Sequence, residues 1–512
     1  MALPNLGRTP LPKPGKIRYG VSPTGPGAPA GFDRTCRAGF VVVASERTAM
    51  AFQRLAPPDP GPLTQPGGRA LRIALLCPRG PLYRHRGGIW KKTMRYAPLT
   101  LTTLASLIPP EINAEVSLLD EGVDEIDPGA ICADLVGITV ITGTAPRAYE
   151  LAKEFRRRQI PVVLGGVHPT LVPEEAARHA DSVVVGYAEE SWPQLLRDFA
   201  AGRMQRRYDQ SPALKLDGLP FPRRDLYKSG MVNVSDTIEA TRGCIFQCEF
   251  CVVPTAWGTR PLQKPVGDVI ADLRQMGAKR VIFLDLNLIA DLPYARELFT
   301  ALIPLKLRWA GLVTTTVAWD EELLDLAARS GCRGLLIGFE SLDQNALDET
   351  RKSFNMRKDY HLVVDRIHDR GIAIMGCFVF GFDSDTLETF DRTVDFVMES
   401  RMDLPRYAIA VPFPATALYR RLKSENRLLT EDWSLYDGQH VVFQPRHMSP
   451  DELLHNTGRA WKKTYQYKSI ARRVLGSGTR MTISVAANLG YRFYANNLDK
   501  FYTCDWQLAP RA

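Results

Sequence analysis

The sequence has 512 residues, 45% of them hydrophobic and 24% charged, and a formal net charge of +9, which is typical of about two or three globular domains. It contains no long uncharged apolar run and no apolar core near its start, so we expect neither a transmembrane segment nor a signal peptide. The modest positive charge permits contact with an anionic cofactor, substrate or membrane surface, and no basic, aromatic-laced stretch indicates nucleic-acid binding.

The chain begins with a segment rich in Pro, Gly and Ala. Residues 1–70 cannot bury enough apolar surface to offset the entropy lost on ordering, so we expect them to be mostly disordered. Within this segment the short apolar patch Gly39–Ala44 is compatible with one strand.

Short apolar strands alternate with helical patterns over residues 71–200. This alternation predicts a doubly wound α/β domain with a parallel sheet, in which ligands bind at the carboxyl ends of the strands. The expected strands are Arg72–Cys77, Glu115–Asp120, Leu135–Val140, Pro161–Leu164 and Ser182–Val185, and the expected helices are Leu99–Leu107, Ala145–Arg158, Pro173–His179 and Glu190–Phe199.

Glycines and hydroxyl groups follow the last three of these strands. Glycine lets the backbone approach a ligand closely, and threonine hydroxyls offer hydrogen bonds, so we expect the turns to line a ligand site. For His168 a turn histidine bonded to backbone and a ligand-contacting histidine are both compatible with the sequence. The candidate residues are Thr139, Thr142, Gly143, Thr144, Gly165, Gly166, His168, Gly186 and Glu189.

A polar, proline-bearing stretch, residues 201–230, predicts a linker. Strand and helix signals then alternate over residues 231–445, which predicts a partial βα barrel with its chemistry at the carboxyl ends of the strands. The expected strands are Thr237–Thr241, Arg280–Asp285, Trp309–Thr314, Gly334–Phe339, Ile372–Phe380 and the start of Tyr407–Ala415, and the expected helices include Val266–Met276, Pro293–Leu302 and Glu321–Ser330.

Three closely spaced cysteines follow the first barrel strand. Cys244, Cys248 and Cys251 stand in Cys-x₃-Cys-x₂-Cys spacing, one thiolate short of the four that hold an ordinary four-iron cluster. Three thiolates leave one iron open to a substrate or cofactor. Buried structural thiols and an incomplete zinc site are the alternatives, and the uneven spacing without a second ligand pair favours the cluster.

Acidic residues close two other barrel strands. Asp285 ends the second strand, and Glu340 follows Gly338 at the end of the fourth. Such residues either line a site or cap the following helix. The nine cysteines, three of them grouped, suit a reducing cytoplasm better than a disulfide framework.

Residues 446–512 predict a helical extension. Ser449–Arg473 has a helical pattern that begins with a capping signal, and its two basic pairs, Lys462 with Lys463 and Arg472 with Arg473, predict a solvated face. For the aromatic tail we expect packing against the body of the protein, with a membrane-surface contact as the alternative. The tail residues are Tyr491, Phe493, Tyr494, Phe501, Tyr502 and Trp506.

The cysteine segment Thr241–Pro254 resembles the signature of the radical S-adenosylmethionine (SAM) superfamily. In that superfamily the three cysteines bind a [4Fe–4S] cluster, and the amino and carboxylate groups of SAM chelate the fourth iron. One electron then cleaves SAM to methionine and a 5′-deoxyadenosyl radical. The resemblance implies a SAM contact for Gly338 and Glu340 and a site-lining position for Asp285.

Residues 71–200 are similar to the cobalamin-binding domain found ahead of many radical SAM domains. The similarity lies in Gly165–Pro169, in Gly186–Glu189 and in the order of strands and helices. The Asp-x-His-x-x-Gly signature of cobalt-ligating domains is missing, because His85 has no aspartate two residues before it. The resemblance therefore implies cobalamin without a histidine on cobalt, with a degenerate Rossmann domain as the alternative.

The combined resemblance implies methyl transfer to an unreactive carbon. One SAM would methylate cob(I)alamin, a second would yield the radical that abstracts a substrate hydrogen, and the substrate radical would take the methyl group. The expected substrate is a lipid, terpenoid, tetrapyrrole or antibiotic precursor, and the expected electron donor is a reductase such as flavodoxin or ferredoxin. A radical SAM cyclase or rearrangement enzyme, and a non-catalytic cobalamin- or redox-responsive module, are the alternatives; no residue is assigned as catalytic.

Overall fold

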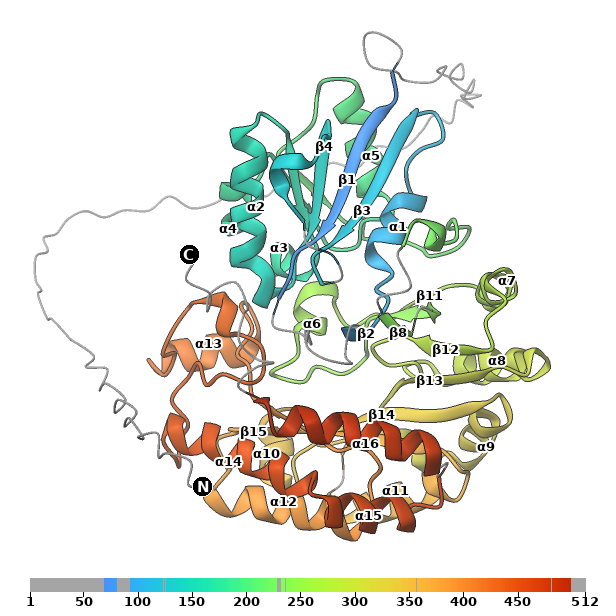
Figure 1. Ribbon diagram of the computed structural model, residues 1–512, viewed down its shortest axis with the longest axis vertical. Coiled ribbons are helices and arrows are strands. Elements are labelled where there is room, and N and C mark those ends of the chain that lie inside the picture. Colours follow the sequence, from blue (N-terminus) through green and yellow to red (C-terminus); the bar gives the residue numbers. More distant parts are fainter. Residues whose placement is uncertain are drawn as a thin grey trace, which may run out of the picture. The chain divides into compact units, whose positions relative to one another are not determined.

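The computed structural model describes residues 69–80, 93–122, 124, 126–227, 232–234, 236–355, 357–479 and 481–498 (Figure 1). Several predictions of the sequence lie outside these residues: the disorder of residues 1–68, the strand Gly39–Ala44, His85, and the tail aromatics Phe501, Tyr502 and Trp506. Across the described ranges, every helix is too short or too polar to cross a bilayer.

The first sheet has six parallel strands. Their order is β3-β1-β4-β5-β6-β7, so the strand order reverses beside β1 and the chain builds outward in both directions. That reversal creates a crevice at the carboxyl ends of the strands, where ligands bind in such sheets. The strands are β1 (Leu71–Cys77), β3 (Ala114–Asp120), β4 (Leu135–Thr139), β5 (Val162–Gly165), β6 (Ser182–Val185) and β7 (Arg207–Asp209).

Helices cover both faces of this sheet (Figure 1). Phe155 of α2 (Ala145–Arg157) and Ala176 of α4 (Pro173–His179) belong to one apolar cluster. Leu101 of α1 (Thr100–Ser106) and Leu195 of α5 (Ser191–Ala200) belong to the other. Strands buried on both faces explain the continuous apolar runs in the sequence, and the predicted doubly wound fold is confirmed.

The second sheet also has six parallel strands, and here spatial order follows chain order. Successive parallel crossovers in one direction place the helices on one side and wind the sheet into a partial barrel, as predicted. The strands are β9 (Thr237–Ile238), β12 (Arg280–Phe283), β13 (Arg308–Val313), β14 (Cys332–Glu340), β15 (Ala373–Phe380) and β16 (Arg406–Ile409), and the helices that cover it are α7 (Val266–Met276), α8 (Leu292–Leu302), α9 (Glu321–Arg329), α11 (Tyr360–His368) and α12 (Leu387–Glu399).

Shorter elements connect and extend these two sheets. They are the strand pairs β2 (Thr93–Tyr96) with β8 (Val232–Val234) and β10 (Thr241–Arg242) with β11 (Leu262–Gln263), and the helices α3 (Val167–Leu171), α6 (Val252–Trp257), α10 (Gln344–Glu349) and α13 (Ala417–Ser424). Two of the elements differ from the sequence-based expectation. The predicted linker contributes strand β7, and the predicted turn after β5 continues into α3.

The C-terminal region is helical, as predicted, but the helical pattern of Ser449–Arg473 is interrupted after Thr464. It is divided into α14 (Pro450–Thr464) and α15 (Tyr467–Gly476), followed by α16 (Met481–Ala495). Arg473 does not belong to a solvated face, because it is fully buried and donates to the carbonyls of Met402 and Asp403 at 2.9 and 2.8 Å. Tyr494 is buried beside Trp461, so this part of the aromatic tail packs against the body as expected.

Candidate functional site

The three cysteines lie on the loop that leaves β10 and enters α6. Gly243, at φ +86°, turns the chain into this loop, and the Cys251 amide donates to the Cys248 carbonyl at 3.1 Å. All three thiols are free and partly buried. This backbone hydrogen bond closes a tight turn between Cys248 and Cys251 and keeps the two residues close together.

Burial makes two of these thiols, Cys248 and Cys251, poor thiolates unless a positive group binds them. It raises the pKa of the Cys248 thiol, and it raises the pKa of Cys251 to about 12. Each of these two thiols interacts electrostatically with the other cysteines of the loop and with Lys352. A bound metal group would replace the thiol protons and offset this cost.

The spacing of the thiols bears on the size of such a group. Within the described ranges, no three His, Cys, Asp or Glu side chains converge closely enough to hold a single metal ion. A zinc ion requires ligands about 2.3 Å from one point, whereas a four-iron cluster binds each cysteine through a different iron. The three thiols of a cluster therefore need not converge on one point, as the ligands of a zinc ion must.

Asp285 fixes the backbone ahead of the cysteine loop. Its buried carboxylate accepts hydrogen bonds from the Ala240 amide at 3.2 Å and from the amide and hydroxyl of Thr241. Burial raises the pKa of Asp285 to about 7. The structure therefore gives this predicted site residue a positioning contact with the loop.

Asn287 lies beside the first cysteine. The side chain is 1% exposed, and its amide nitrogen is 3.6 Å from the Cys244 sulfur. Its amide oxygen is buried and has no hydrogen-bond partner among the described residues. An N–H group directed at a cysteine sulfur is one of the features that raise the potential of an iron–sulfur cluster.

Glu340 forms a buried ion pair. Its carboxylate lies 2.7 Å from the ammonium of Lys352, and the two residues are 8% and 7% exposed. Gly338 leaves room for this pair, because a Cβ there would lie 2.2 Å from the Glu340 carboxylate. Burial alone would lower the pKa of Lys352, but chiefly the Glu340 carboxylate raises it, so the ammonium stays charged beside the cysteines.

The segment after α10 supports the cysteine loop through several contacts. The carbonyl of Thr350 accepts from the Glu249 amide at 2.9 Å, and the ring of Phe354 stacks on Phe246 with centroids 3.6 Å apart. The Asn355 amide donates to the Gly338 carbonyl at 2.8 Å and ties this segment to the end of β14. The loop and the Glu340 strand end are therefore held by one short segment.

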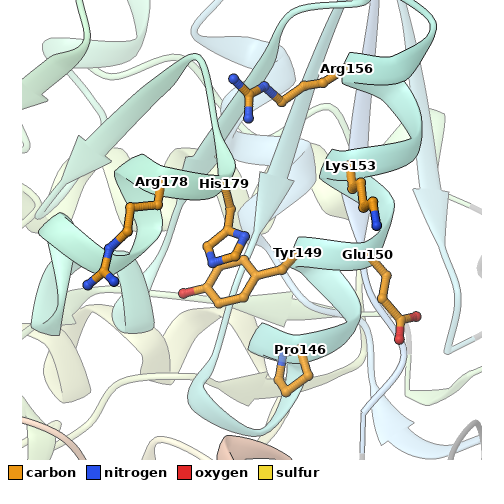
Figure 2. A pocket seen from close by; sticks show the side chains of 7 residues that line it. All are labelled: Pro146, Tyr149, Glu150, Lys153, Arg156, Arg178 and His179. Carbon is orange, nitrogen blue, oxygen red and sulfur yellow. The ribbon is translucent and has the colours of Figure 1, made fainter.

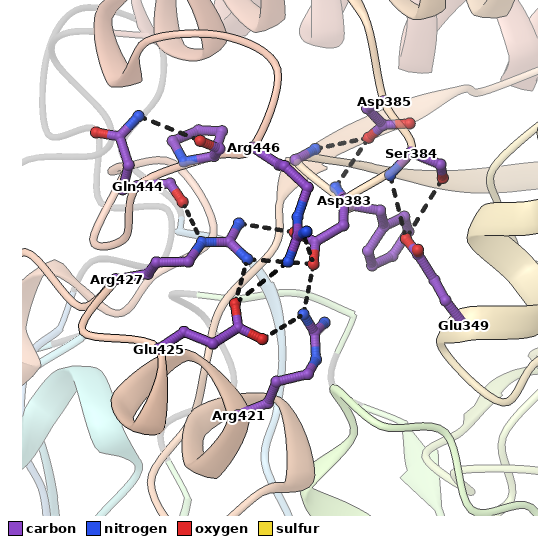
Figure 3. A network of polar contacts seen from close by, with 12 residues as sticks. Glu349, Asp383, Ser384, Asp385, Arg421, Glu425, Arg427, Gln444 and Arg446 are labelled. Atoms are coloured by element: carbon purple, nitrogen blue, oxygen red, sulfur yellow. Dashed lines mark hydrogen bonds and ion pairs between the residues drawn. The ribbon is translucent and has the colours of Figure 1, made fainter.

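A cluster of arginines lies on and after α13 and gathers around Asp383 (Figure 3). Arg421 donates to the Glu249 carboxylate at 2.9 Å, and Glu249 lies between the second and third cysteines. Arg421 and Arg427 also converge on Asp383, which follows β15. Glu249 thus receives both a backbone contact from one side and a guanidinium from the other.

The turns of the first sheet direct their polar side chains inward. The hydroxyl of Thr144 accepts from the Ile141 amide at 3.2 Å, and Thr142 lies 3.4 Å from the imidazole of His168. Thr142, Gly143 and Thr144 are buried in one 3₁₀ turn, while Ile141 is 42% exposed. In this 3₁₀ turn the exposed side chain is therefore the apolar Ile141, and the hydroxyls of Thr142 and Thr144 face inward.

Two glycines of these turns are required by neighbouring protein atoms. A Cβ at Gly166, where φ is +101°, would lie 2.8 Å from the Val140 carbonyl and 3.1 Å from the Thr139 hydroxyl. At Gly186, where φ is +83°, it would lie 2.6 Å from Gln210. A Cβ at Gly165 would lie at ordinary contact distance from Val184, 3.6 Å from its Cβ. Close packing of adjacent strand ends therefore explains Gly166 and Gly186 without a ligand.

His168 is fully buried, with side chains at both ring nitrogens. Nδ1 faces the Thr142 hydroxyl, and Nε2 lies 3.1 Å from the Tyr149 hydroxyl and 3.4 Å from the Glu175 carboxylate. Trp433, from beyond the barrel, donates to Glu175 at 3.0 Å. The ring joins side chains rather than backbone, and it leaves no exposed surface for a cofactor contact.

Glu189 connects the first sheet to the cysteine loop. Its buried carboxylate is paired with Arg242, which directly precedes Gly243 and the first cysteine. The Arg242 guanidinium lies 4.8 Å from the Tyr187 ring centroid, and Tyr187 stacks on Trp257 of α6 at 5.3 Å. The turn after β6 is thereby attached to both ends of the cysteine loop.

A separate groove lies on the outer side of α2 and α4 (Figure 2). Its volume is about 440 Å³, and the rings of Tyr149 and His179 stack within it at 3.9 Å. It carries basic side chains and lies on helices rather than at the strand ends. The lining residues are Pro146, Tyr149, Glu150, Lys153, Arg156, Arg178 and His179.

Sequence reasoning missed three residues that hold the site together. Arg242 had one available signal, its place next to the cysteine motif. Lys352 and Asn355 had none, because their contacts with Glu340 and Gly338 at the end of β14 form only once the segment after α10 folds back onto that strand.

Comparisons with known proteins match three segments of the chain to family models. A B12-binding domain model matches residues 115–196, a radical SAM superfamily model matches residues 238–397, and a domain of unknown function matches residues 416–505. The chain is 32% identical over 390 residues to bacteriochlorophyllide d C-12(1)-methyltransferase of Chlorobaculum tepidum, covering 74% of this chain and 85% of that protein. It is 31% identical over 417 residues to bacteriochlorophyllide d C-8(2)-methyltransferase of the same organism, covering 77% and 91%.

The fold is also similar to a solved structure. The radical SAM methyltransferase TsrM from Kitasatospora setae, with cobalamin and a [4Fe–4S] cluster bound, superposes with a TM-score of 0.59 and 21% identity. The match covers 76% of this chain and 85% of that one. At this level of identity the similarity shows a shared fold.

Proposed function

Because the chain belongs to the family of radical SAM enzymes that carry a B12-binding domain, we propose that it transfers a methyl group to an unactivated carbon of a hydrophobic small molecule. The observation that carries the proposal is the buried Arg242–Glu189 pair. It attaches the cysteine loop to a strand end of the B12-binding domain, and methyl transfer requires both cofactors to act on one substrate.

The residues of the loop fit the cluster that the family implies. Cys244, Cys248 and Cys251 would hold three irons, and SAM would bind the open fourth iron beside Glu340. When bound, these groups supply a strong one-electron reductant and a carbon radical. Lys352 places a positive charge next to the thiolates, and the Phe246–Phe354 stack excludes water from one side of the loop.

We propose that the first sheet holds cobalamin through shape; His85, the other candidate histidine, lies outside the described residues. His168 is buried with side chains at both ring nitrogens, so it is not available to a metal. Exposed Ile141 and the backbone of the neighbouring turns supply an apolar surface at the strand ends. We expect the corrin to rest against that surface, with Thr139, Gly165 and the other turn residues shaping it from beneath.

The substrate class follows from the relatives. Two proteins that are more than 30% identical to this chain have names that describe methylation of a bacteriochlorophyllide. We therefore propose a tetrapyrrole or a molecule of similar size and polarity. A flavodoxin or ferredoxin as electron donor, and a cytoplasmic location, stay predictions of the sequence.

The proposal is tested by anaerobic reconstitution with iron and sulfide, followed by SAM and a strong reductant. Wild type should bind one four-iron cluster and release 5′-deoxyadenosine. The Cys244→Ala/Cys248→Ala/Cys251→Ala variant should do neither. The matched control is Cys132→Ala, an exposed cysteine elsewhere in the chain, which should behave as wild type.

Two outcomes would count against the proposal. Equal cluster content in the wild type and the triple variant would remove the ligand assignment. A product that carries no additional methyl group would instead favour an oxidative cyclase or a rearrangement, and failure to cleave SAM would favour a binding module.

A further inference from the structure

The two C-terminal helices α15 and α16 expose apolar side chains on a basic surface. We propose that this pair, named here the basic hairpin (residues 467–495), docks the protein on an anionic lipid surface. The inference does not depend on methyl transfer, and it assigns a role to a region whose family model has no assigned function.

The helices of the basic hairpin run antiparallel and side by side. The Arg492 guanidinium lies 3.8 Å from the centroid of the Tyr467 ring, so the end of α16 meets the start of α15. Farther along, Arg473 donates to the Asn488 amide oxygen at 2.9 Å. These contacts place exposed residues near the end of α15 next to those near the start of α16.

Large apolar side chains on the hairpin point into solvent. Tyr467 is 66% exposed and Leu475 is 74% exposed on α15, at a spacing that places both on one face of the helix. Val485 and Leu489, one turn apart on α16, are 37% and 46% exposed. Leaving four such side chains in water is unfavourable unless another surface covers them.

The charge of this region is of one sign. Residues 453–498 contain no Asp or Glu, and Lys468 and Arg472 are exposed on α15 among its apolar residues. The opposite, buried side is satisfied internally, because Arg473 binds backbone carbonyls and Ile470 and Val474 belong to the core. An amphipathic helix with apolar side chains between basic ones is typical of binding at the surface of an anionic bilayer.

Charge also argues against a second copy of the chain as the occupant. Two such hairpins would bring basic residues against basic residues with no acidic partner in residues 453–498. An anionic lipid surface offers negative headgroups for Lys468 and Arg472 and a less polar layer for Leu475. Such docking would place the enzyme where large hydrophobic substrates partition.

The test is flotation of the full-length protein with vesicles of phosphatidylcholine, with and without phosphatidylglycerol. Wild type should bind the anionic vesicles about tenfold more tightly or better, and the binding should weaken as salt rises. Lys468→Glu/Arg472→Glu should lose at least this factor. Leu475→Ser should weaken binding at every lipid composition, because it removes apolar contact without changing charge.

The matched control is Lys153→Glu/Arg178→Glu, which makes the same change in net charge in the groove of α2 and α4. It should bind vesicles as wild type does. If both double variants lost vesicle binding equally, the binding would depend only on the net charge of the protein, and the proposal would be overturned. Equal binding with and without phosphatidylglycerol, or a dimer that the Leu475→Ser change dissociates, would also overturn it.

Discussion

Removing one member of the buried Glu340–Lys352 pair is expected to destabilise the protein far more than removing both. Lys352→Met leaves the Glu340 carboxylate, 8% exposed, without the ammonium 2.7 Å away. An uncompensated buried charge costs about 3–5 kcal/mol, whereas replacing both members of a pair by uncharged groups is often nearly neutral. Glu340→Gln should destabilise the protein by a similar amount, because it leaves the buried ammonium of Lys352 without its carboxylate partner.

The assay is a double-mutant cycle on the protein without its cluster. Denaturant unfolding of wild type, both single variants and Glu340→Gln/Lys352→Met gives four free energies for the transition that includes the second sheet. We expect the double variant to be more stable than the sum of the single effects by at least about 2 kcal/mol. Additive costs, within about 0.5 kcal/mol, would show that the two charges do not depend on each other.

Three further predictions concern single residues. Asn287→Leu removes the N–H group facing Cys244 and should lower the reduction potential of the cluster. We expect a tenfold smaller ratio of reduced to oxidised cluster at a fixed potential, which corresponds to a shift of about 59 mV. An unchanged midpoint in a redox titration would contradict this prediction. Burial raises the pKa of Asp385 to about 7, whereas an aspartate in the unfolded chain ionises at a pH of about 4. Wild type should therefore lose stability relative to Asp385→Asn as the pH rises from about 4 to 7, by roughly 4 kcal/mol at most. Parallel plots of unfolding free energy against pH for the two proteins would refute the assignment. His168→Ala should leave the electron paramagnetic resonance spectrum of bound cob(II)alamin without nitrogen splitting, as in wild type, and splitting that this substitution or His85→Ala abolishes would overturn the ligand-free cobalt.

The elements with strong local patterns are the ones that the sequence predicts best. The apolar run Ser182–Val185 forms β6 with the predicted bounds, because turn residues flank it on both sides. β7 (Arg207–Asp209) was missed because a three-residue polar strand has no periodicity and forms only by pairing with β6. The sequence pattern identifies strands that are themselves apolar, whereas a polar strand such as β7 is recognised only from its pairing with a neighbouring strand.

Side-chain direction is the part of the site that sequence could not predict. The hydroxyls of Thr142 and Thr144 were expected to face a cofactor, but they are buried against His168 and the turn backbone. Arg473 was assigned to a solvated face from its basic neighbour, yet buried carbonyls of distant residues hold it inside. For Thr142 and Arg473 the partner comes from another segment, which local spacing does not reveal, whereas Thr144 is held by the Ile141 backbone within its own turn.

The most direct test of the central claim uses SAM with a deuterium-labelled methyl group. Reconstituted protein with cobalamin and reductant is given a bacteriochlorophyllide or a related tetrapyrrole, and the products are weighed by mass spectrometry. We predict one new carbon-bound trideuteromethyl group per product, formed only when Cys244, Cys248 and Cys251 are intact and cobalamin is present. A substrate that is altered without gaining the label, or labelled equally without cobalamin, would contradict the proposed methyl transfer.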